Sequence, residues 1–354
     1  MLRLRVAARG EIAHAAGLSQ PTVGRIVDEL LSEQIFAKSI TTGELLKPGR
    51  PSEQLTLDRG RKRFLAIELG VEETRIAAVP VGVEDRDSWD AHFPTPGSAK
   101  AWAQVLVKTV ASLPAAGEGP QAVILSVPGV VDEGQSRPIL CPNIPWAPQA
   151  DFAALLKPIC PTPPILIQEI RALALGQLLA EPGLSDFLLV DVGAGVGASA
   201  VVRGELYHSP LALSGELGHI PVAGNIRPCG CGSAGCVETL ISRAGLLLTA
   251  KEKHIAGTWP SLVKHIHGAG VEPWLADALD ALAMSMISGV NILGIRTVLL
   301  SGMLNEFPGP ITDYLAKGLG KGAMWARFGE VTLRLIPRRR IAGMVLAGIS
   351  KVLV

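Results

Sequence analysis

FLLVDVGAGVGASAVV, residues 187–202, predicts two β-strands joined by a glycine-rich turn. The strands are Phe187–Asp191 and Gly197–Val202, and Gly193, Gly195 and Gly197 lie in or beside the turn. Glycines let backbone N–H groups approach a phosphate closely. The spacing differs from that of a dinucleotide-binding fingerprint, however, and a strand rather than a helix follows. A tight hairpin explains these glycines equally well, so phosphate binding and a plain turn both stay open.

Strands and helices alternate on both sides of this hairpin. Further strands are expected at Phe64–Ile67, Arg75–Val81, Ala122–Val127, Ile165–Ile167 and Thr297–Leu300. Helices are expected at Ala101–Ala115, Asp151–Leu156, Ala172–Leu179 and Pro273–Leu293. Such alternation is typical of an α/β architecture. A charged linker, Asp58–Arg63, separates this body from an N-terminal segment with a different pattern.

The composition of the 354 residues excludes several classes of protein. With 48% hydrophobic and 18% charged residues, the chain can bury a sizeable core and is not broadly disordered. Aromatic residues make up only 4%, which argues against a protein that stacks many single-stranded bases. The net charge is +1, but residues 1–63 carry 11 Lys and Arg against 7 Asp and Glu. A small basic head therefore precedes a slightly acidic body.

No segment has the roughly 18 uncharged apolar residues that a membrane span needs. The longest candidate, Ala281–Ile295, contains Asn291 and stops at Arg296. Met1–Arg5 lacks the apolar stretch of a signal peptide. Five cysteines, three of them within Cys229–Cys236, fit a reducing compartment better than a disulfide scaffold. We therefore expect a cytoplasmic protein that does not associate with membranes.

GEIAHAAGLSQPTVGRIVDELLSEQIFAK, residues 10–38, predicts a helix-turn-helix. A short helical period ends at Gly17, Ser19 is a good N-cap, and the second helix has a continuous apolar face. That face consists of Val23, Ile26, Val27, Leu30 and Leu31. In such a unit the start of the second helix enters the DNA major groove. The predicted contacts to bases or phosphates, all off the apolar face, are Ser19, Gln20, Thr22 and Arg25.

A hairpin follows the second helix. Ile35–Ser39 and Gln54–Leu57 are the expected strands, and they flank the turn-rich Thr41–Arg50. Lys47 and Arg50 are placed to meet the DNA backbone or minor groove. The segment as a whole predicts a winged helix-turn-helix that binds double-stranded DNA; a small helical cap with an ordinary hairpin is the alternative. Little chain precedes Arg9, so the supporting first helix must be short or cut off.

The strongest chemical signal is His219 followed by CGCGSAGC, residues 229–236. The predicted ligands of a structural Zn²⁺ are one imidazole and three thiolates, from His219, Cys229, Cys231 and Cys236. The interleaved glycines allow a turn sharp enough to bring the sulfurs to one ion. Metal binding then cross-links two segments and contributes local folding energy. Four protein ligands leave no open position for catalysis. Three buried or redox-paired cysteines are the alternative.

Two carboxylates flank the predicted metal ligands. Glu216 precedes His219 by three residues, and Glu238 follows Cys236 by two. Carboxylates held by a rigid metal loop suit the binding of sugar hydroxyls, because each oxygen accepts more than one hydrogen bond. Solvated surface acids are the alternative interpretation.

Several segments together resemble the ROK family of bacterial repressors and sugar kinases. LSGELGH, residues 213–219, resembles the family's A-G-E-x-G-H, and Cys229–Glu238 resembles its C-x-C-G-x-x-G-C-x-E. The other similar segments are Ser126–Asp132, Pro142–Trp146, Leu299–Gly302 and the closing helix Ala342–Val354. The head, including Gly49–Pro51, resembles the winged helix of the repressor branch. The resemblance covers nearly the whole chain.

This resemblance implies an actin-like (ribonuclease H-like), two-lobed ATPase fold behind the winged helix-turn-helix, with a sugar site in the cleft and self-association. The head is expected at residues 1–62, the first lobe at 63–170 plus 341–354, and the second lobe, with the zinc loop, at 171–340. The sugar contacts that it implies are Asn143, Gln168, Glu169, Glu216, His219 and Glu238. His219 would serve metal and sugar with one ring nitrogen each.

The phosphate motifs of the family's kinases are altered in this chain. ELGVEET, residues 68–74, replaces the motif D-x-G-x-T, so that Glu72 and Glu73 lie where nucleotide phosphates would bind. Like charges at that place oppose a polyphosphate. Ala194 replaces the threonine of the G-T-G loop. Gly193, Gly195 and Gly197 are therefore interpreted as the remnant of a phosphate loop.

The catalytic Asn-Asp pair of the kinases is replaced by Gln168-Glu169, with Arg171 beside it. Glu169 is one methylene longer than Asp, and a misplacement of about 1 Å costs on the order of a hundredfold in rate. We therefore assign no catalytic residue and regard Glu169 as a vestigial base. The same changes alter residues that would touch the sugar itself.

These observations predict a sugar-responsive transcriptional regulator, a repressor in the first instance, that forms a homodimer or homotetramer. Paired heads would read the two halves of a roughly palindromic operator. The first alternative is an active ATP-dependent hexose kinase, similar to a glucokinase, that carries an extra DNA-binding head. The second is a DNA-binding protein with a vestigial cleft, whose signal is a partner protein.

Overall fold

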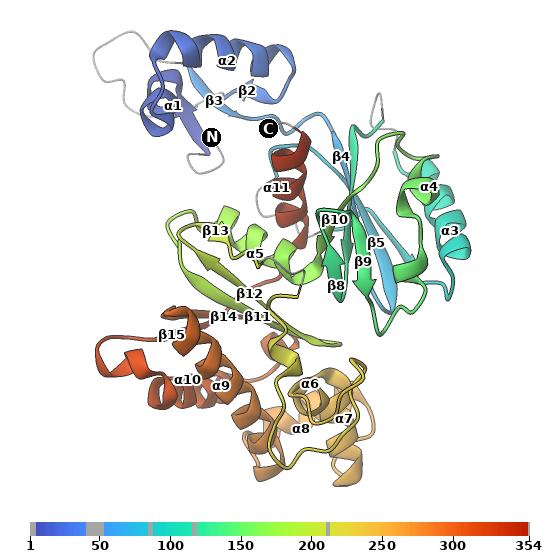
Figure 1. Ribbon diagram of the computed structural model, residues 1–354, viewed down its shortest axis with the longest axis vertical. Helices are drawn as coiled ribbons and strands as arrows, with labels where there is room; N and C mark the ends of the chain where they lie inside the picture. The colour runs from blue at the N-terminus through green and yellow to red at the C-terminus, as the bar shows by residue number, and fades with distance from the viewer. Residues whose placement is uncertain (1–4, 40–52, 84–87, 115–118, 210–212, 353–354) are drawn as a thin grey trace.

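The computed structural model describes residues 5–39, 53–83, 88–114, 119–209 and 213–352. It has an N-terminal head and two α/β lobes (Figure 1). The predicted α/β class and two-lobed arrangement are therefore confirmed. Lys47 and Arg50, the predicted wing contacts, lie outside the described residues.

The head is a helix-turn-helix on a three-stranded sheet. Its elements are β1 (Val6–Ala8), α1 (Arg9–Ala16), α2 (Gln20–Ser32), β2 (Phe36–Lys38) and β3 (Gln54–Leu57), with strand order β1-β3-β2. Gly17 ends α1 in the left-handed region with φ 65°, and the Ser19 hydroxyl caps α2 by accepting from the Thr22 N–H at 3.3 Å. Val23 and Val27 are buried, as the periodicity predicts. Strand β1, only three residues long, was not predicted.

The first lobe is built on a five-stranded sheet in the order β10-β7-β4-β5-β6. Its strands are β4 (Phe64–Leu69), β5 (Glu73–Val79), β6 (Ala91–Pro94), β7 (Ala122–Val127) and β10 (Ile165–Gln168). Side chains of β4 alternate between two cores: Leu65 and Ile67 pack with α3 (Ala99–Ser112) and α4 (Phe152–Leu156), whereas Phe64 and Ala66 pack toward α11 (Arg340–Val352). A small hairpin, β8 (Val130–Asp132) and β9 (Arg137–Leu140), follows β7.

The second lobe repeats this topology in the order β13-β12-β11-β14-β15. Its strands are β11 (Phe187–Val192), β12 (Val196–Val202), β13 (Glu205–Leu206), β14 (Thr297–Gly302) and β15 (Thr332–Leu335). Its main core contains residues of α6 (Glu238–Ile241), α7 (Arg243–Glu252), α8 (Trp259–Ala269), α9 (Pro273–Leu293) and α10 (Gly309–Gly322). In each lobe three antiparallel strands come first, and two parallel strands then extend the sheet beyond the first strand.

Helix α9 is long and apolar enough, by length and composition, to cross a membrane. Five of its large side chains are nevertheless fully buried in the second lobe's core: Leu275, Leu279, Leu282, Met286 and Val290. This is the pattern of a core helix of an α/β domain, and its bounds are those that the sequence predicts.

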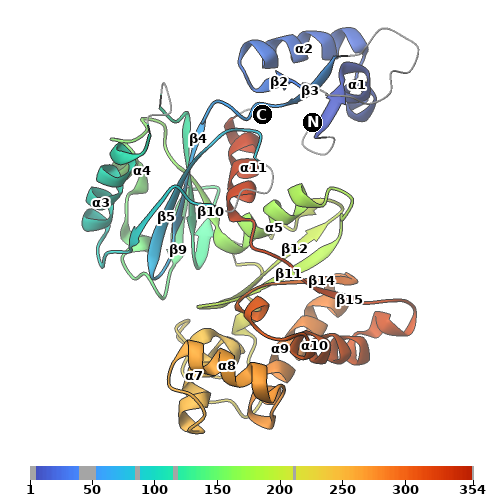
Figure 2. The ribbon, with the colours of Figure 1, turned by 180° about the vertical axis from the view of Figure 1, so that it is seen from behind.

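Helices α5 (Glu169–Ala180) and α11 pack against each other between the lobes (Figures 1 and 2). A Cβ on Gly343 would lie 1.7 Å from the Ala172 carbonyl oxygen, so glycine is required for this close approach. Ile336 packs in a second-lobe core and Ile341 in the first-lobe core. The short segment 337–340 therefore crosses from one lobe to the other.

The head and the first lobe share one apolar core. Val27 and Leu55 of the head belong to the same buried cluster as Val81 and the strands of the first lobe. Arg63 is 2% exposed and donates to the Glu33 carbonyl, just after α2, and to Gln121 Oε1 at 2.7 Å. The position of α2 is thereby tied to the first-lobe sheet.

Candidate ligand cleft and metal cluster

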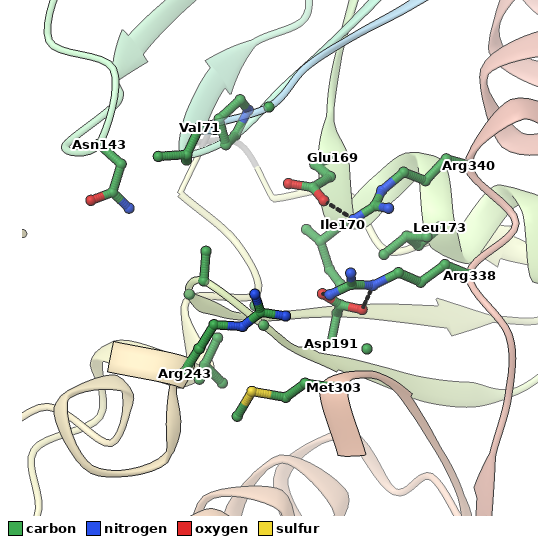
Figure 3. Close-up of a pocket in the computed structure, with 18 of the residues that line it drawn as sticks. Val71, Asn143, Glu169, Ile170, Leu173, Asp191, Arg243, Met303, Arg338 and Arg340 are labelled. Carbon is green, nitrogen blue, oxygen red and sulfur yellow. Dashed lines mark hydrogen bonds and ion pairs between the residues drawn. The ribbon is translucent and has the colours of Figure 1, made fainter. Parts of the chain in front are cut away.

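A cleft of about 800 Å³ lies between the two lobes. It is lined by the β4–β5 and β11–β12 turns, the start of α5, the end of β14 and the 335–340 connection. The predicted sugar contacts and loop glycines all line it: Asn143, Gln168, Glu169, Glu216, His219, Glu238, Gly193, Gly195 and Gly197. In Figure 3, Asn143 belongs to the first-lobe side of the cleft and Arg243 to the second-lobe side. The fold thus brings together residues that are far apart in the sequence.

The four predicted metal ligands form a compact cluster. Their ligand atoms all lie within 4.8 Å of one another, with 3.5 Å between Cys229 Sγ and His219 Nδ1 and 3.8 Å between Cys231 Sγ and Cys236 Sγ. Zn–S bonds of about 2.3 Å at tetrahedral angles require edges of about 3.8 Å. Burial and the two neighbouring thiols raise the pKa of Cys236 to about 12, because three thiolates repel each other without a cation. Spacing and donor chemistry therefore fit a divalent metal.

His219 links this cluster to the cleft. Its Nδ1 faces the cysteines, whereas its Nε2 lies 3.6 Å from Glu216 Oε2. Burial raises the pKa of Glu216, against the lowering effects of the His219 charge and a hydrogen bond with Gln168. A metal on Nδ1 would orient the imidazole so that Nε2–H points toward Glu216 and the cleft.

The glycine-rich turn is occupied by side chains of this chain. Glu238 Oε2 accepts the Val196 N–H at 2.8 Å, and a Cβ on Gly195 would lie 2.7 Å from the same oxygen. A Cβ on Gly193 would lie 2.6 Å from Arg338 Nη2. The absence of Cβ atoms therefore makes room for a carboxylate and a guanidinium.

Two arginines after β15 neutralise the acids at the base of the cleft. Arg338 forms a bidentate pair with Asp191, at 2.7 and 2.6 Å, and Arg340 pairs with Glu169 (Figure 3). Arg340 also pairs with Glu68 at 3.1 Å. Arg340 is 6% exposed. Burial raises the pKa of Glu68 and the Arg340 charge opposes it. The three carboxylates raise the pKa of Arg340 despite its burial, so this guanidinium stays charged.

A model of the ROK family matches residues 64–324. The chain belongs to the ROK family. A putative xylose repressor from Caldicellulosiruptor sp. (strain Rt8B.4) is 26% identical over 284 residues, which are 76% of this chain and 65% of that protein. An N-acetylmannosamine kinase from Salmonella arizonae is 30% identical over 189 residues, 53% of this chain and 64% of that protein. The chain spans just under two thirds of the length of each of these relatives.

The fold of the whole chain also matches a ROK regulator. The crystal structure of a ROK family transcriptional regulator, a homologue of the E. coli MLC protein, has a TM-score of 0.72 at 18% sequence identity. The match covers 98% of this chain and 91% of the other. The arrangement of head and lobes is therefore one that a ROK regulator adopts.

Two departures from the ROK kinase pattern have unforeseen partners. Glu73 pairs with Arg75 at 2.5 Å, and hydrogen bonding to Arg75 lowers the pKa of Glu73. Arg171 pairs with Glu133 at 2.8 Å and is not among the side chains that line the cleft. Arg171 therefore does not add positive charge to the cleft. The negative charge that Glu72 and Glu73 bring to the cleft is reduced, because Glu73 is paired with Arg75.

The predicted DNA contacts lie at the exposed start of α2. Gln20 and Arg25 are exposed, whereas the hydroxyls of Ser19 and Thr22 lie 2.8 Å apart and bond to each other. Asp28, one of the two acids of α2, pairs with Arg9 at 2.6 Å. Among the described residues of this ROK head, Arg25 is the predicted contact with an exposed positive charge.

Arg338 and Arg340 are not among the site residues that the sequence predicts. The only local signal is the run of arginines at residues 338–340, just before the apolar helix α11. A run of like charges ordinarily indicates a solvated surface, and their partners lie far away in the sequence.

Proposed function

We propose that this ROK protein is a sugar-responsive, DNA-binding transcriptional regulator that acts as a repressor. We further propose that it works as a homodimer or a larger homo-oligomer. The observation that carries the proposal is the helix-turn-helix packed into the same apolar core as the lobe that lines the cleft. A ligand that changes the relation of the lobes would therefore move the head together with the first lobe. Such a ligand shifts operator affinity only if it binds one arrangement more tightly.

The cleft suits a sugar better than a reacting ATP. The cleft is lined by carboxylates and an imidazole, from Glu216, Glu238 and His219. They lie next to the four predicted metal ligands, where a structural Zn²⁺ would fix their backbone. Glu169, the candidate base, is engaged by Arg340. A base that is ion-paired with a buried guanidinium is a poor acceptor for a sugar hydroxyl proton. This arrangement favours binding without phosphoryl transfer.

The direct test measures binding of the full chain, with zinc, to DNA fragments from beside its own gene, with and without pentoses and hexoses. D-xylose is the first candidate, because a 26% identical relative is a putative xylose repressor. We expect one sugar to change operator affinity at least tenfold. Sugar binding without any change in operator affinity contradicts the proposal. So does ADP release with ATP, magnesium and a hexose at ordinary enzyme rates, about 1–1,000 per second.

Replacing Arg25 with Ala is expected to weaken operator binding about 5- to 150-fold, because one base or phosphate contact contributes about 1–3 kcal/mol. Fluorescence anisotropy at several salt concentrations measures this, and a lost phosphate contact also lowers the salt slope by about one. Lys264→Ala removes one exposed charge from α8 and serves as the control. If Arg25→Ala binds the operator with unchanged affinity, the DNA does not bind at the start of α2.

A further inference from the structure

We propose that Arg338 fills the phosphate-binding part of the cleft and thereby excludes nucleotides from it. A cleft blocked in this way would bind a sugar without binding a nucleotide. This inference rests on the proposed function only in assuming that the cleft is a ligand site, and its test measures nucleotide binding rather than DNA binding.

The position of Arg338 follows from two glycines at the ends of adjacent strands. Gly302 ends β14 and is paired in register with Val192, the last residue of β11, and Gly193 follows Val192 directly. A Cβ on Gly193 would lie 2.6 Å from Arg338 Nη2, and a Cβ on Gly302 would lie 2.7 Å from the same atom. The space beside Gly193 is therefore occupied by one planar cation, which also lies next to Gly302, where the Val192 carbonyl oxygen would be 2.1 Å from a Cβ.

The guanidinium of Arg338 forms an ion pair with Asp191. Its Nε and Nη2 donate to the two carboxylate oxygens at 2.7 and 2.6 Å, and the Ser301 hydroxyl donates to Oδ1 at 2.6 Å. Burial alone would raise the pKa of Asp191, but Arg338 outweighs it and the pKa is lowered. A bidentate pair of this kind is strong and fixed in direction.

The same pair occupies Asp191, a carboxylate beside the turn that could otherwise hold magnesium. Mg²⁺ in nucleotide sites is bound through one or two carboxylates plus phosphate oxygens. Asp191 lies two residues before Gly193, and both of its oxygens already accept from Arg338. Arg338 therefore blocks the phosphates sterically and the metal electrostatically.

A purely structural role for Arg338 makes a different prediction. If the pair only ties the 335–340 connection to the second-lobe sheet, its removal lowers stability and does nothing for nucleotides. If Arg338 excludes nucleotides, its removal uncovers a carboxylate and two glycines facing the cleft, and Mg–nucleotide binding appears.

The experiment compares the wild-type chain with Arg338→Ala and Arg338→Gln by calorimetric titration with ADP and a non-hydrolysable ATP analogue, with and without Mg²⁺. We expect wild-type binding weaker than about 1 mM and at least tenfold tighter, Mg²⁺-dependent binding in Arg338→Ala, with Arg338→Gln between them. Asp191→Asn in the Arg338→Ala background should abolish the gain. Arg334→Ala is the matched control. Arg334 lies on β15, and its replacement removes a surface ion pair with Glu181, so nucleotide binding should stay at the wild-type level.

Two outcomes overturn the inference. One is tight Mg–nucleotide binding by the wild-type chain, with Arg338 in place. The other is a folded Arg338→Ala or Arg338→Gln protein, with near-wild-type thermal melting, that binds nucleotide no better than wild type. Sugar-dependent operator binding is measured on the same samples, so failure of the proposed function is seen separately.

Discussion

Replacing Cys231 with Ser is expected to lower the zinc content from about one ion per chain to well below one. Cys231 is one of four donors whose atoms lie within 4.8 Å of one another, and three donors hold Zn²⁺ far more weakly than a closed tetrahedron. When free zinc exceeds the dissociation constant about a thousandfold, the bound ion stabilises the folded chain by about 4 kcal/mol. Most of that stabilisation should be lost, together with sugar affinity, because His219 and its neighbours lose their anchor.

Elemental analysis and thermal melting measure both effects. Wild-type protein treated with a chelator should melt like Cys231→Ser, and added zinc should rescue only the wild type. Cys160→Ala is the matched control, since Cys160 is buried in the first-lobe core, away from the cluster, and should leave zinc content unchanged. Full zinc content in Cys231→Ser, or unchanged melting after complete zinc removal, shows that these side chains are not a structural metal site.

Local signals in the sequence predict the features that depend on local chemistry. The cap at Ser19, the left-handed Gly17 and the apolar period of α2 lie within a few residues of one another, and the two helices of the head form as expected. Helix α9 begins and ends at the predicted residues because proline starts it and glycine follows it. The sequence predicts that the helix after β10 begins at Ala172, whereas α5 begins at Glu169. No loop intervenes, so Gln168 ends the strand and Glu169 begins α5.

The pairing of charges at the base of the cleft has no local signal in the sequence. Asp191 and Arg338 are 147 residues apart, and Glu169 and Arg340 are 171 apart. Their pairing depends on where the 337–340 segment crosses between the lobes, which no periodicity encodes. The glycines of the turn illustrate the same limit. Sequence leaves phosphate binding and a plain hairpin open, whereas the structure gives a third answer, in which Gly193 and Gly195 accommodate Arg338 and Glu238.

Replacing Arg340 with Met is expected to destabilise the chain by about 3–5 kcal/mol, because it leaves buried carboxylates without their cation. Arg340 and Glu68 side chains are each 8% exposed, and the side chain of Glu169 is 28% exposed. Urea unfolding followed by intrinsic fluorescence measures the loss. Glu169→Gln in the same background should recover part of it. Arg334→Met, which removes an exposed pair with Glu181, should cost less than about 1 kcal/mol.

The pH dependence separates an electrostatic cause from lost packing. Glu68 already has a raised pKa from burial, and loss of the Arg340 charge should raise it further. A carboxyl whose pKa is higher in the folded than in the unfolded chain favours folding below its ordinary pKa and loses that contribution as pH rises through the folded value. The deficit of Arg340→Met should therefore be smaller near about pH 5 than near about pH 7. A deficit that stays constant over this range means that the packing of the Arg340 side chain, rather than its charge, stabilises the fold.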